Sequence, residues 1–469
     1  MPRPGLASDH GSPSDRAGTV ASVTADTDPR AVMERAGIAA TAISVFERQL
    51  ADVRAGAGGL LRDADIDTYV APSLDGADGD TTALAGTAMI RLNGGLGTSM
   101  GMEQAKSLLD VRNGLSFLDV IVRQVQSLRA ITGARIPLTF LHSFRTSADS
   151  LAALGAYPDL AVDDLPIELM QHRVPKLLAD DLVPVSWPSD PELEWCPPGH
   201  GDLYTVLHAT GFLDRLAELG FERVFVANSD NLGAVPDPAV ASWFADSGAP
   251  FAIEAVRRTP SDRKGGHFAI RKSDGRLVLR ETAQTPPDEQ GDIDRHPFTS
   301  TNNLWFDVAA ARRLLDENGG DLGLPVIINR KTVDPTDKES PAVIQLETAM
   351  GAAVEVFDGA TTVEVGRDRF IPVKTTDDLL VVRSDCYRLT DDFRLVQVPD
   401  EIPFVELAPC YKLIDDFDRR FPAGAPSLAE ATSLIVRGDW TFGADVRIVG
   451  DVELDEAGGT IPDGTVLGA

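Results

Sequence analysis

The stretch RLNGGLGTSMG, residues 91–101, followed by Lys106, is the most informative part of this chain. It comes directly after the apolar residues 88–90, which indicate the end of a buried strand. Three of the four residues 94–97 are glycine, so the turn carries almost no side chains. Backbone N–H groups can surround phosphate oxygens only where no Cβ blocks the approach. The stretch therefore predicts a phosphate-binding turn beside one mobile positive charge, Lys106.

Two familiar phosphate-binding patterns do not fit this turn. A P-loop requires Gly-Lys-Ser/Thr in sequence, whereas Lys106 follows Ala105 and lies well beyond the last glycine of the turn. A dinucleotide-binding fingerprint requires G-x-G-x-x-G at the opening of a helix, and residues 95–101 are spaced one residue differently. An ordinary glycine-rich turn without a ligand is the alternative for this stretch taken alone.

Length, charge and cysteine content restrict the classes of protein that fit. The 469 residues are 43% hydrophobic, enough for a large core and about two or three domains. The net charge of −29 argues against DNA or RNA as partners. It favours a cation such as Mg²⁺ at any site for an anionic nucleotide, although solubility or a salty habitat explains such acidity equally well.

No segment contains the roughly 20 apolar residues of a membrane helix, and no secretory signal is visible, so we expect no membrane association. The three cysteines match no zinc spacing and indicate no disulfide framework. A reducing, cytoplasmic location is therefore expected.

The chain divides into four predicted segments. Residues 1–29 are rich in Pro, Gly, Ser, Asp and Ala and are expected to be a disordered tail. Residues 30–85 begin with apolar side chains at helical spacing, and residues 86–385 form the predicted catalytic domain. In residues 386–469, short valine and isoleucine runs broken by Gly and Asp predict a small parallel β-helix. A small β-sandwich or a loose meander is the alternative for these last strands.

Strands and helices alternate through the predicted catalytic domain, which indicates an α/β fold: a mixed, mostly parallel sheet with helices on both faces. Ligands of such sheets bind beyond the carboxyl ends of the strands. The glycine-rich turn and Asn228-Ser229-Asp230 both follow apolar strands, so we expect them to meet at one edge. Strands are expected at 87–92, 138–142, 222–227, 251–256, 267–271, 277–281 and 303–306, and helices at 116–130, 147–155, 203–218, 307–317 and 342–352.

Two further motifs have functional and structural interpretations. Asp230, flanked by amides at a strand end, has the chemistry of a Mg²⁺ ligand that acts together with phosphates. The alternative is an Asx-turn that caps the next helix. His200 lies between two glycines in PPGHGD, residues 197–202, where imidazole and backbone can approach a ligand closely. A plain turn with a surface histidine is equally consistent with that motif.

Other polar residues complete the inventory. Lys374 follows the apolar run 370–373 and is a second candidate for neutralising phosphates, or a solvated charge. The amides of Asn302 and Asn303 suit sugar hydroxyls or pairing with backbone. The sequence thus combines glycines whose backbone can bind phosphate with isolated lysines and one carboxylate. This combination fits phosphoryl or nucleotidyl transfer, where catalysis rests on positioning and charge neutralisation.

Eight motifs in order over residues 90–460 resemble the UTP–glucose-1-phosphate uridylyltransferases, the UDP-glucose pyrophosphorylases of the eukaryotic-like type. The resemblance implies a GT-A-like nucleotidyltransferase domain with a C-terminal β-helix. It also implies the reversible conversion of UTP and glucose 1-phosphate into UDP-glucose and pyrophosphate with Mg²⁺. The motifs are LNGGLGTSMG with Lys106, GLSFLDVIVRQV (114–125), WCPPGHGD (195–202), ANSDNLGA (227–234), TNNLW (301–305), QLETAMGAA (345–353), RFIPVK (369–374) and the Gly-rich C-terminal strands.

The same resemblance implies roles for single residues. Lys106 and Lys374 resemble the pair that neutralises the phosphates, and Asp230 resembles the metal ligand. His200, Asn302 and Asn303 resemble sugar contacts. The implied nucleotide contacts are Leu92, Asn93, Gly94, Gly95, Gly97, Thr98, Gln171 (the uracil-reading glutamine), Gly199 and Asn228. The chain departs from the family pattern in LMQH at 169–172, where Phe-Asn-Gln-Ser is common, and in Ala105, where proline is usual.

Competing functions stay open at this point. A sister enzyme would make UDP-N-acetylhexosamine or a broad range of UDP-sugars, but such relatives usually carry Arg after Gly-Thr. Here Ser99-Met100 follow Thr98, which favours glucose. A non-catalytic nucleotide-sugar sensor would have a broken lysine or aspartate set, yet the set is complete in this sequence. An acidic structural scaffold leaves the glycine-rich turn unexplained. The C-terminal β-helix could also offer an edge for self-association.

Overall fold

The computed structural model describes residues 28–468, except 57–58, 75–78, 260–261 and 264. Most of the predicted tail, residues 1–27, lies outside the described residues. Helix α1 (Pro29–Arg35) begins where Asp28 accepts a hydrogen bond from the Arg30 N–H at 3.2 Å. Proline at the first helical position needs no hydrogen-bond partner for its nitrogen. Helix α2 (Ala40–Arg54) follows, as the apolar spacing of the second predicted segment indicates.

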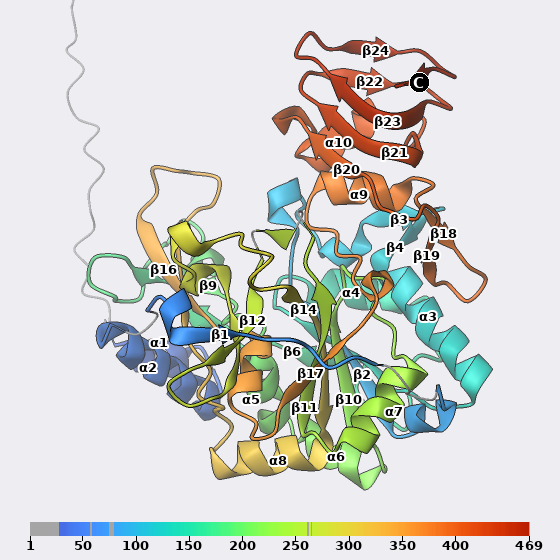
Figure 1. Ribbon diagram of the computed structural model, residues 1–469. Coiled ribbons are helices and arrows are strands. Elements are labelled where there is room, and N and C mark those ends of the chain that lie inside the picture. The colour runs from blue at the N-terminus through green and yellow to red at the C-terminus, as the bar shows by residue number, and fades with distance from the viewer. Residues whose placement is uncertain (1–27, 57–58, 75–78, 260–261, 264, 469) are drawn as a thin grey trace, which may run out of the picture.

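A seven-stranded sheet forms the centre of the main domain (Figure 1). Four of its pairings, β10–β2, β2–β5, β5–β6 and β11–β17, are parallel, whereas β14 runs antiparallel to both of its neighbours. The predicted mixed, mostly parallel sheet is therefore confirmed. In spatial order the strands are β17 (Thr361–Glu364), β11 (Phe251–Arg257), β14 (Phe298–Asp307), β10 (Arg223–Asn228), β2 (Thr87–Asn93), β5 (Leu138–His142) and β6 (Glu168–Met170).

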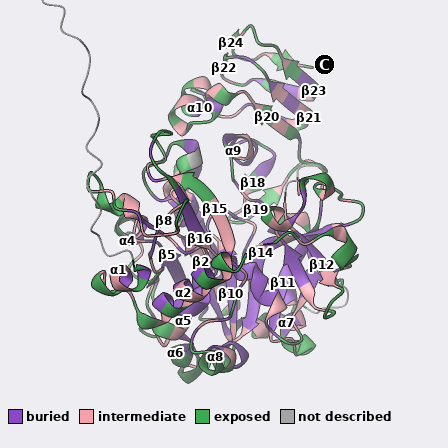
Figure 2. Ribbon diagram, turned by 90° about the vertical axis from the view of Figure 1, so that its left-hand side faces the viewer, coloured by how far each residue is buried: buried purple, intermediate pink, exposed green. Residues whose placement is uncertain are grey.

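Helices cover both faces of this sheet, so its strands are buried on both sides (Figures 1 and 2). Successive side chains of a strand point to opposite faces; accordingly Phe225 belongs to one core, while Val224 and Val226 belong to the other. The first core contains side chains of α3 (Phe117–Thr132), α4 (Ser147–Leu154) and α7 (Pro238–Ser247), and the second those of α5 (Asp202–Ala209), α6 (Phe212–Glu218) and α8 (Val308–Glu317).

One helix prediction is wrong, and another is correct in kind but is interrupted. Residues 342–347 form strand β16 (Ala342–Glu347), which pairs antiparallel with β15 (Ile327–Thr332), and a 3₁₀ helix follows at Met350–Glu355. A short apolar run fits a buried strand as well as a helix. Here the residues form a strand because β15 is available to pair with them. The helix expected at 203–218 is divided into α5 and α6, because Gly211 adopts a left-handed conformation with φ of 64°.

Smaller sheets flank the central one. Strand β1 pairs with β12, which pairs with β13, and β8 extends the β15–β16 pair. Their bounds, with those of the remaining two-stranded pairs, are β1 Ile66–Thr68, β12 His267–Arg271, β13 Leu277–Arg280, β8 Leu177–Leu178, β3 Asp110–Arg112, β4 Leu115–Ser116, β7 Val174–Pro175, β9 Trp195–Cys196, β18 Tyr387–Leu389 and β19 Leu395–Gln397.

The C-terminal strands stack in parallel beyond helix α9 (Thr376–Arg383), with α10 (Ile414–Arg420) beside them, at the top of Figure 1. Among residues 404–468, each observed strand pairing is parallel, which disagrees with a meander. A Cβ on Gly438 would lie 2.6 Å from the Asp455 carbonyl oxygen, so glycine is needed for this close stacking. The strands are β20 (Phe404–Leu407), β21 (Ser427–Val436), β23 (Arg447–Leu454) and β25 (Val466–Leu467) in one sheet, with β22 (Trp440–Phe442) and β24 (Gly459–Ile461) in another.

Candidate functional site

A cavity of about 250 Å³ opens beside the carboxyl ends of β2 and β10. In the parallel register Asn228 lies opposite Leu92, so the glycine-rich turn and the Asp230 loop leave the sheet side by side, as the sequence predicts. The lining residues, most of which the sequence singled out, are Leu92, Asn93, Gly94, Gly95, Lys106, Ser107, Leu141, Gln171, Pro197, Gly199, His200, Asn228, Ser229 and Asp230.

Lys106 joins three of the segments around this cavity. Its Nζ donates a hydrogen bond to Asp230 Oδ2 at 2.8 Å and another to the carbonyl of Val373. A Cβ on Gly97 would lie 3.3 Å from Lys106 Cγ, so the glycine leaves room for the lysine stem. The Lys106 N–H also donates to the Gly95 carbonyl at 3.1 Å. The turn, the lysine and the aspartate therefore form one connected unit.

Arg91, in β2, is completely buried and holds the loop that carries Asp230. Its guanidinium donates to the carbonyls of Asn228 at 2.8 Å and Asn231 at 3.1 Å, and also to that of Ala234. Burial, followed by the charge of Arg369, lowers the pKa of Arg91 to about 9. Arg91 thus stays protonated at neutral pH and places a fixed positive charge next to the Asp230 loop.

Gln171 forms part of the cavity wall between two glycine-containing segments. Its Nε2 donates to the Gly199 carbonyl at 3.2 Å, and a Cβ on Gly94 would overlap Gln171 Oε1. Gly199 has a φ of 82°, and a Cβ there would lie 2.5 Å from the Thr348 carbonyl oxygen. Neither glycine tolerates a side chain without displacement of its neighbours, and the hydrogen bond to the Gly199 carbonyl places the Gln171 amide between the two segments.

His200 is held in one tautomer. The Met350 N–H donates to His200 Nδ1 at 2.9 Å, so the ring proton of the neutral imidazole is on Nε2. Burial lowers the pKa of His200 to about 4. At neutral pH His200 is therefore a hydrogen-bond donor through Nε2 rather than a cation.

Several predicted site residues lie outside the cavity wall. Thr98 is exposed and begins a 3₁₀ turn, and Gly97 packs against the stem of Lys106. Lys374 is exposed, and its backbone N–H donates to Asp378 Oδ2 at 2.7 Å. Burial raises the pKa of Glu281, and the positive charge of Lys374 reduces that rise. Asn302 is partly exposed in a left-handed conformation with φ of 58°.

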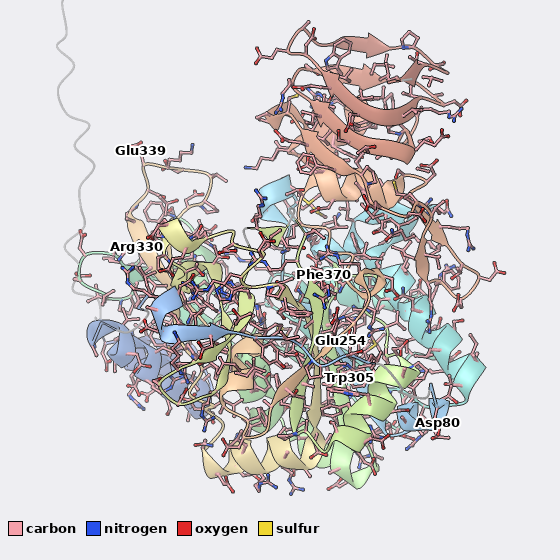
Figure 3. The ribbon with its side chains drawn as sticks, in the orientation of Figure 1. Asp80, Glu254, Trp305, Arg330, Glu339 and Phe370 are labelled. Atoms are coloured by element: carbon pink, nitrogen blue, oxygen red, sulfur yellow. The ribbon has the colours of Figure 1, made fainter. Side chains whose placement is uncertain are left out.

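Asn303, another predicted sugar contact, lies outside the cavity wall and pairs within the protein. Asn303 is fully buried, and its Nδ2 donates to Glu254 Oε2 at 2.9 Å and to the Arg369 carbonyl at 3.3 Å. Its Oδ1 accepts from Asn231 Nδ2 at 3.3 Å. Trp305 Nε1 donates to the same carboxylate at 2.9 Å, and Figure 3 shows Glu254 and Trp305 close together in the main domain. Asn303 therefore belongs to an internal network that occupies both N–H groups of its amide.

Two serines of the cavity wall were missed by the sequence analysis. The hydroxyls of Ser107 and Ser229 are buried and have no hydrogen-bond partner among the described residues. Their positions next to Lys106 and Asp230 were the only available signal. Unpaired buried hydroxyls are costly, so both are suited to a ligand that supplies polar partners.

Asp230 is the one carboxylate among the described residues of the cavity wall. No group of three or more His, Cys, Asp or Glu side chains gathers as a metal site within the described part of the chain. A single carboxylate fits Mg²⁺, which commonly uses one or two carboxylates and completes its coordination with substrate phosphates and water.

A glycine turn, a fixed lysine and a single aspartate at the carboxyl edge of a mostly parallel sheet define a nucleotide-binding α/β protein. A sequence profile described as UTP--glucose-1-phosphate uridylyltransferase matches residues 63–449. The UTP--glucose-1-phosphate uridylyltransferase of Solanum tuberosum is 38% identical over 390 residues, covering 81% of this chain and 79% of the relative. That of Saccharomyces cerevisiae is 38% identical over 395 residues, covering 82% and 77%. The chain belongs to the UTP--glucose-1-phosphate uridylyltransferase family.

Solved structures agree with this assignment. A UDP-glucose phosphorylase from Trypanosoma brucei superimposes with a TM-score of 0.88 and 42% identity, covering 94% of this chain and 97% of that one. A variant of the Leishmania major UDP-glucose pyrophosphorylase, crystallised in complex with UDP-glucose, gives a TM-score of 0.88 and 40% identity, covering 93% and 96%. Within the described residues, every helix is too short or too polar to cross a membrane.

Proposed function

We propose that this protein transfers the uridylyl group of UTP to glucose 1-phosphate, giving UDP-glucose and pyrophosphate in a reversible reaction. Membership of the family supports the proposal, as do the printed names of the relatives. The observation that carries it is the cavity in which the glycine-rich turn, Lys106 and Asp230 are joined. Such a cavity offers backbone N–H groups, a cation and one carboxylate to a nucleotide triphosphate.

The nucleoside lies against the segments that Gln171 connects. The backbones of Gly94 and Gly95 face the uracil or ribose, Gln171 reads the base edge, and Gly199 lies against the base. The support is steric: Gly94 and Gly199 have no room for a side chain, and Gln171 is held between them. A fixed amide discriminates between bases because the wrong base leaves it unpaired. The wall also holds Leu92, Asn93 and Asn228 for the nucleotide.

In the reaction, a phosphate oxygen of glucose 1-phosphate attacks the α-phosphorus of UTP in line. A new P–O bond forms, and the bond from the α-phosphorus to the pyrophosphate oxygen breaks. Holding both substrates in line contributes up to roughly 7–11 kcal/mol in well-oriented cases. Lys106 and Lys374 neutralise negative charge on the oxygens around that phosphorus and on the departing pyrophosphate.

Asp230 would hold Mg²⁺ together with phosphate oxygens of the substrate, because it is the one carboxylate among the described residues of the wall. When bound, the cation supplies neutralisation and orientation of the phosphates. His200 donates from Nε2 toward the sugar side, and the Asn302 amide is a second sugar contact. Ser107 and Ser229 gain hydrogen-bond partners from the substrate.

The C-terminal strands form a short parallel β-helix in this proposal. Parallel pairing of β20, β21, β23 and β25, with β22 and β24 paired separately, supports it. Its edge strand is available for self-association. The free cysteines are consistent with the expected cytoplasmic location.

Pyrophosphate release tests the proposed function. The assay uses UTP and Mg²⁺ with glucose, galactose and N-acetylglucosamine 1-phosphates in parallel. We expect the highest kcat/KM with glucose 1-phosphate and loss of turnover with excess EDTA. Preference for N-acetylglucosamine 1-phosphate would instead identify the sister enzyme. Binding of UDP-glucose without any pyrophosphate release would identify a sensor.

A further inference from the structure

We propose that Lys106 occupies the place of the divalent cation at Asp230 in the nucleotide-free protein, and thereby excludes free metal until a nucleotide triphosphate draws the lysine away. The inference rests on the proposed function for the identity of the nucleotide. It goes further in giving the loading of the site an order, with metal entering together with the triphosphate.

The contact that carries this inference is the ion pair within the cavity wall. Lys106 Nζ lies 2.8 Å from Asp230 Oδ2, and the two side chains are only 16% and 25% exposed. An ion pair so enclosed is less screened by water and salt than a surface pair. A second hydrogen bond to the Val373 carbonyl holds the ammonium in this position. Asp230 is therefore neutralised before any ligand arrives.

The other charges near Asp230 also oppose a free cation. Arg91 is buried beneath the same loop, and its guanidinium is bonded to carbonyls rather than to a carboxylate. Arg369 is a further neighbouring cation, but Glu254 pairs with it at 2.6 Å. Two cations, Lys106 in the wall and Arg91 beneath the loop, thus stand against the single carboxylate of the wall, Asp230. A free dication would meet repulsion at the very carboxylate that must bind it.

A nucleotide triphosphate reverses this balance. Its phosphate oxygens are acceptors for the three donors of the Lys106 ammonium, and their negative charge compensates Arg91 and Lys106 together. Once Lys106 turns to the phosphates, Asp230 Oδ2 is released for the metal. The same side chain therefore guards the carboxylate in the empty protein and neutralises phosphate in the loaded one.

Titration of nucleotide-free protein with Mn²⁺, followed by the electron paramagnetic resonance of free Mn²⁺, tests the inference. We expect Lys106→Met to gain one site whose Kd is at least roughly tenfold lower than that of any Asp230-dependent site in the wild type. The double variant Lys106→Met/Asp230→Asn should lose that site. Lys338→Met, which removes an exposed lysine in the loop after β15, is the control with the same change in net charge. Lys106→Arg keeps a cation and should keep the metal out.

Two outcomes would overturn the inference: identical Mn²⁺ binding by Lys106→Met and wild type, or tight Asp230-dependent binding by the nucleotide-free wild type. Unfolding temperatures of all variants identify any that fail to fold, and Lys106→Gln then replaces Lys106→Met as the variant without the positive charge. Absence of pyrophosphate release by the wild type would refute the proposed function while leaving the Mn²⁺ result interpretable. The two proposals can therefore fail separately.

Discussion

Two polar clusters next to the central sheet contain similar residue types but differ in how completely their hydrogen bonds are satisfied. In the internal network, Glu254 accepts from Arg369, Asn303 and Trp305 at distances of 2.6–2.9 Å. In the cavity, the hydroxyls of Ser107 and Ser229 have no partner among the described residues. Buried polar groups are normally paired. A saturated network stabilises the fold, whereas an unsaturated one is available to a ligand.

Among the variants considered, removal of Glu254 from the saturated network should cause the largest loss of stability. Glu254→Ala removes the carboxylate that pairs directly with the buried guanidinium of Arg369, which costs about 3–5 kcal/mol of unfolding free energy. Urea denaturation followed by circular dichroism measures the loss. Glu254→Gln keeps the shape and most hydrogen bonds, and is expected to lose less. An unfolding free energy unchanged by both variants would mean that the network does not stabilise the protein.

Lys374→Ala should separate catalysis from stability. Lys374 is exposed and outside the cavity wall, so the unfolding free energy should hardly change. If its ammonium neutralises charge only in the transition state, kcat falls by about a hundredfold or more, corresponding to about 3 kcal/mol. The dissociation constant for UTP should change far less. Steady-state kinetics and calorimetric UTP binding measure the two effects, and wild-type turnover would remove Lys374 from the mechanism.

Gly94→Ala should weaken UTP binding without a large loss of stability. Its Cβ overlaps Gln171 Oε1, so the glutamine must move and its proposed hydrogen bonds to the base are lost. Loss of such pairing costs about 1–3 kcal/mol. Gly59→Ala is the control, because no atom lies within 4 Å of a Cβ there and the residue is outside the cavity wall. Equal UTP affinities for both variants in calorimetry would argue against the proposed position of Gln171.

A third cluster should affect stability least at neutral pH and more at acidic pH. In it, the rings of His267 and His296 stack with their centroids 4.1 Å apart, beside Arg280. Burial and the neighbouring positive charges lower the pKa of His267 to about 3, and burial lowers that of His296. The unfolded chain takes up these protons near its ordinary pKa of 6.5, before the folded protein does. The unfolding free energy should therefore fall as the pH drops from about 6.5 toward 3.

Urea denaturation at a series of pH values measures this dependence. In His267→Phe the slope between these pH values should be smaller than in the wild type, while stability above pH 7 changes for packing reasons only. An unchanged slope in the variant would show that His267 does not titrate differently in the folded and unfolded states.

The central sheet and the centre of the site were predictable because their signals are local. Apolar runs followed by glycine, or by Asn-Ser-Asp, mark strand ends, and parallel strand ends share one edge of a sheet. The turn, Lys106 and Asp230 accordingly lie at one cavity. The helix expected at 342–352 failed because a short apolar run has no preference until a partner strand, here β15, is present.

Single roles of polar side chains were harder to predict. Asn302 and Asn303 are identical neighbours in the sequence, yet only Asn303 is enclosed with both amide N–H groups bonded within the protein. Ser107 and Ser229 gave no signal of their own beyond their neighbours. The partners of a polar side chain can lie far away in the sequence: Asn303 donates to the carbonyl of Arg369, more than sixty residues further along the chain.

The sequence by itself determined which backbone can approach a phosphate and which charged groups stand near it, because glycine, lysine and aspartate have these properties wherever they are placed. Only the tertiary structure decided which polar groups were already satisfied. Whether a buried amide, hydroxyl or ammonium is free to bind depends on partners that folding brings together, as the pairing of Lys106 with Asp230 demonstrates.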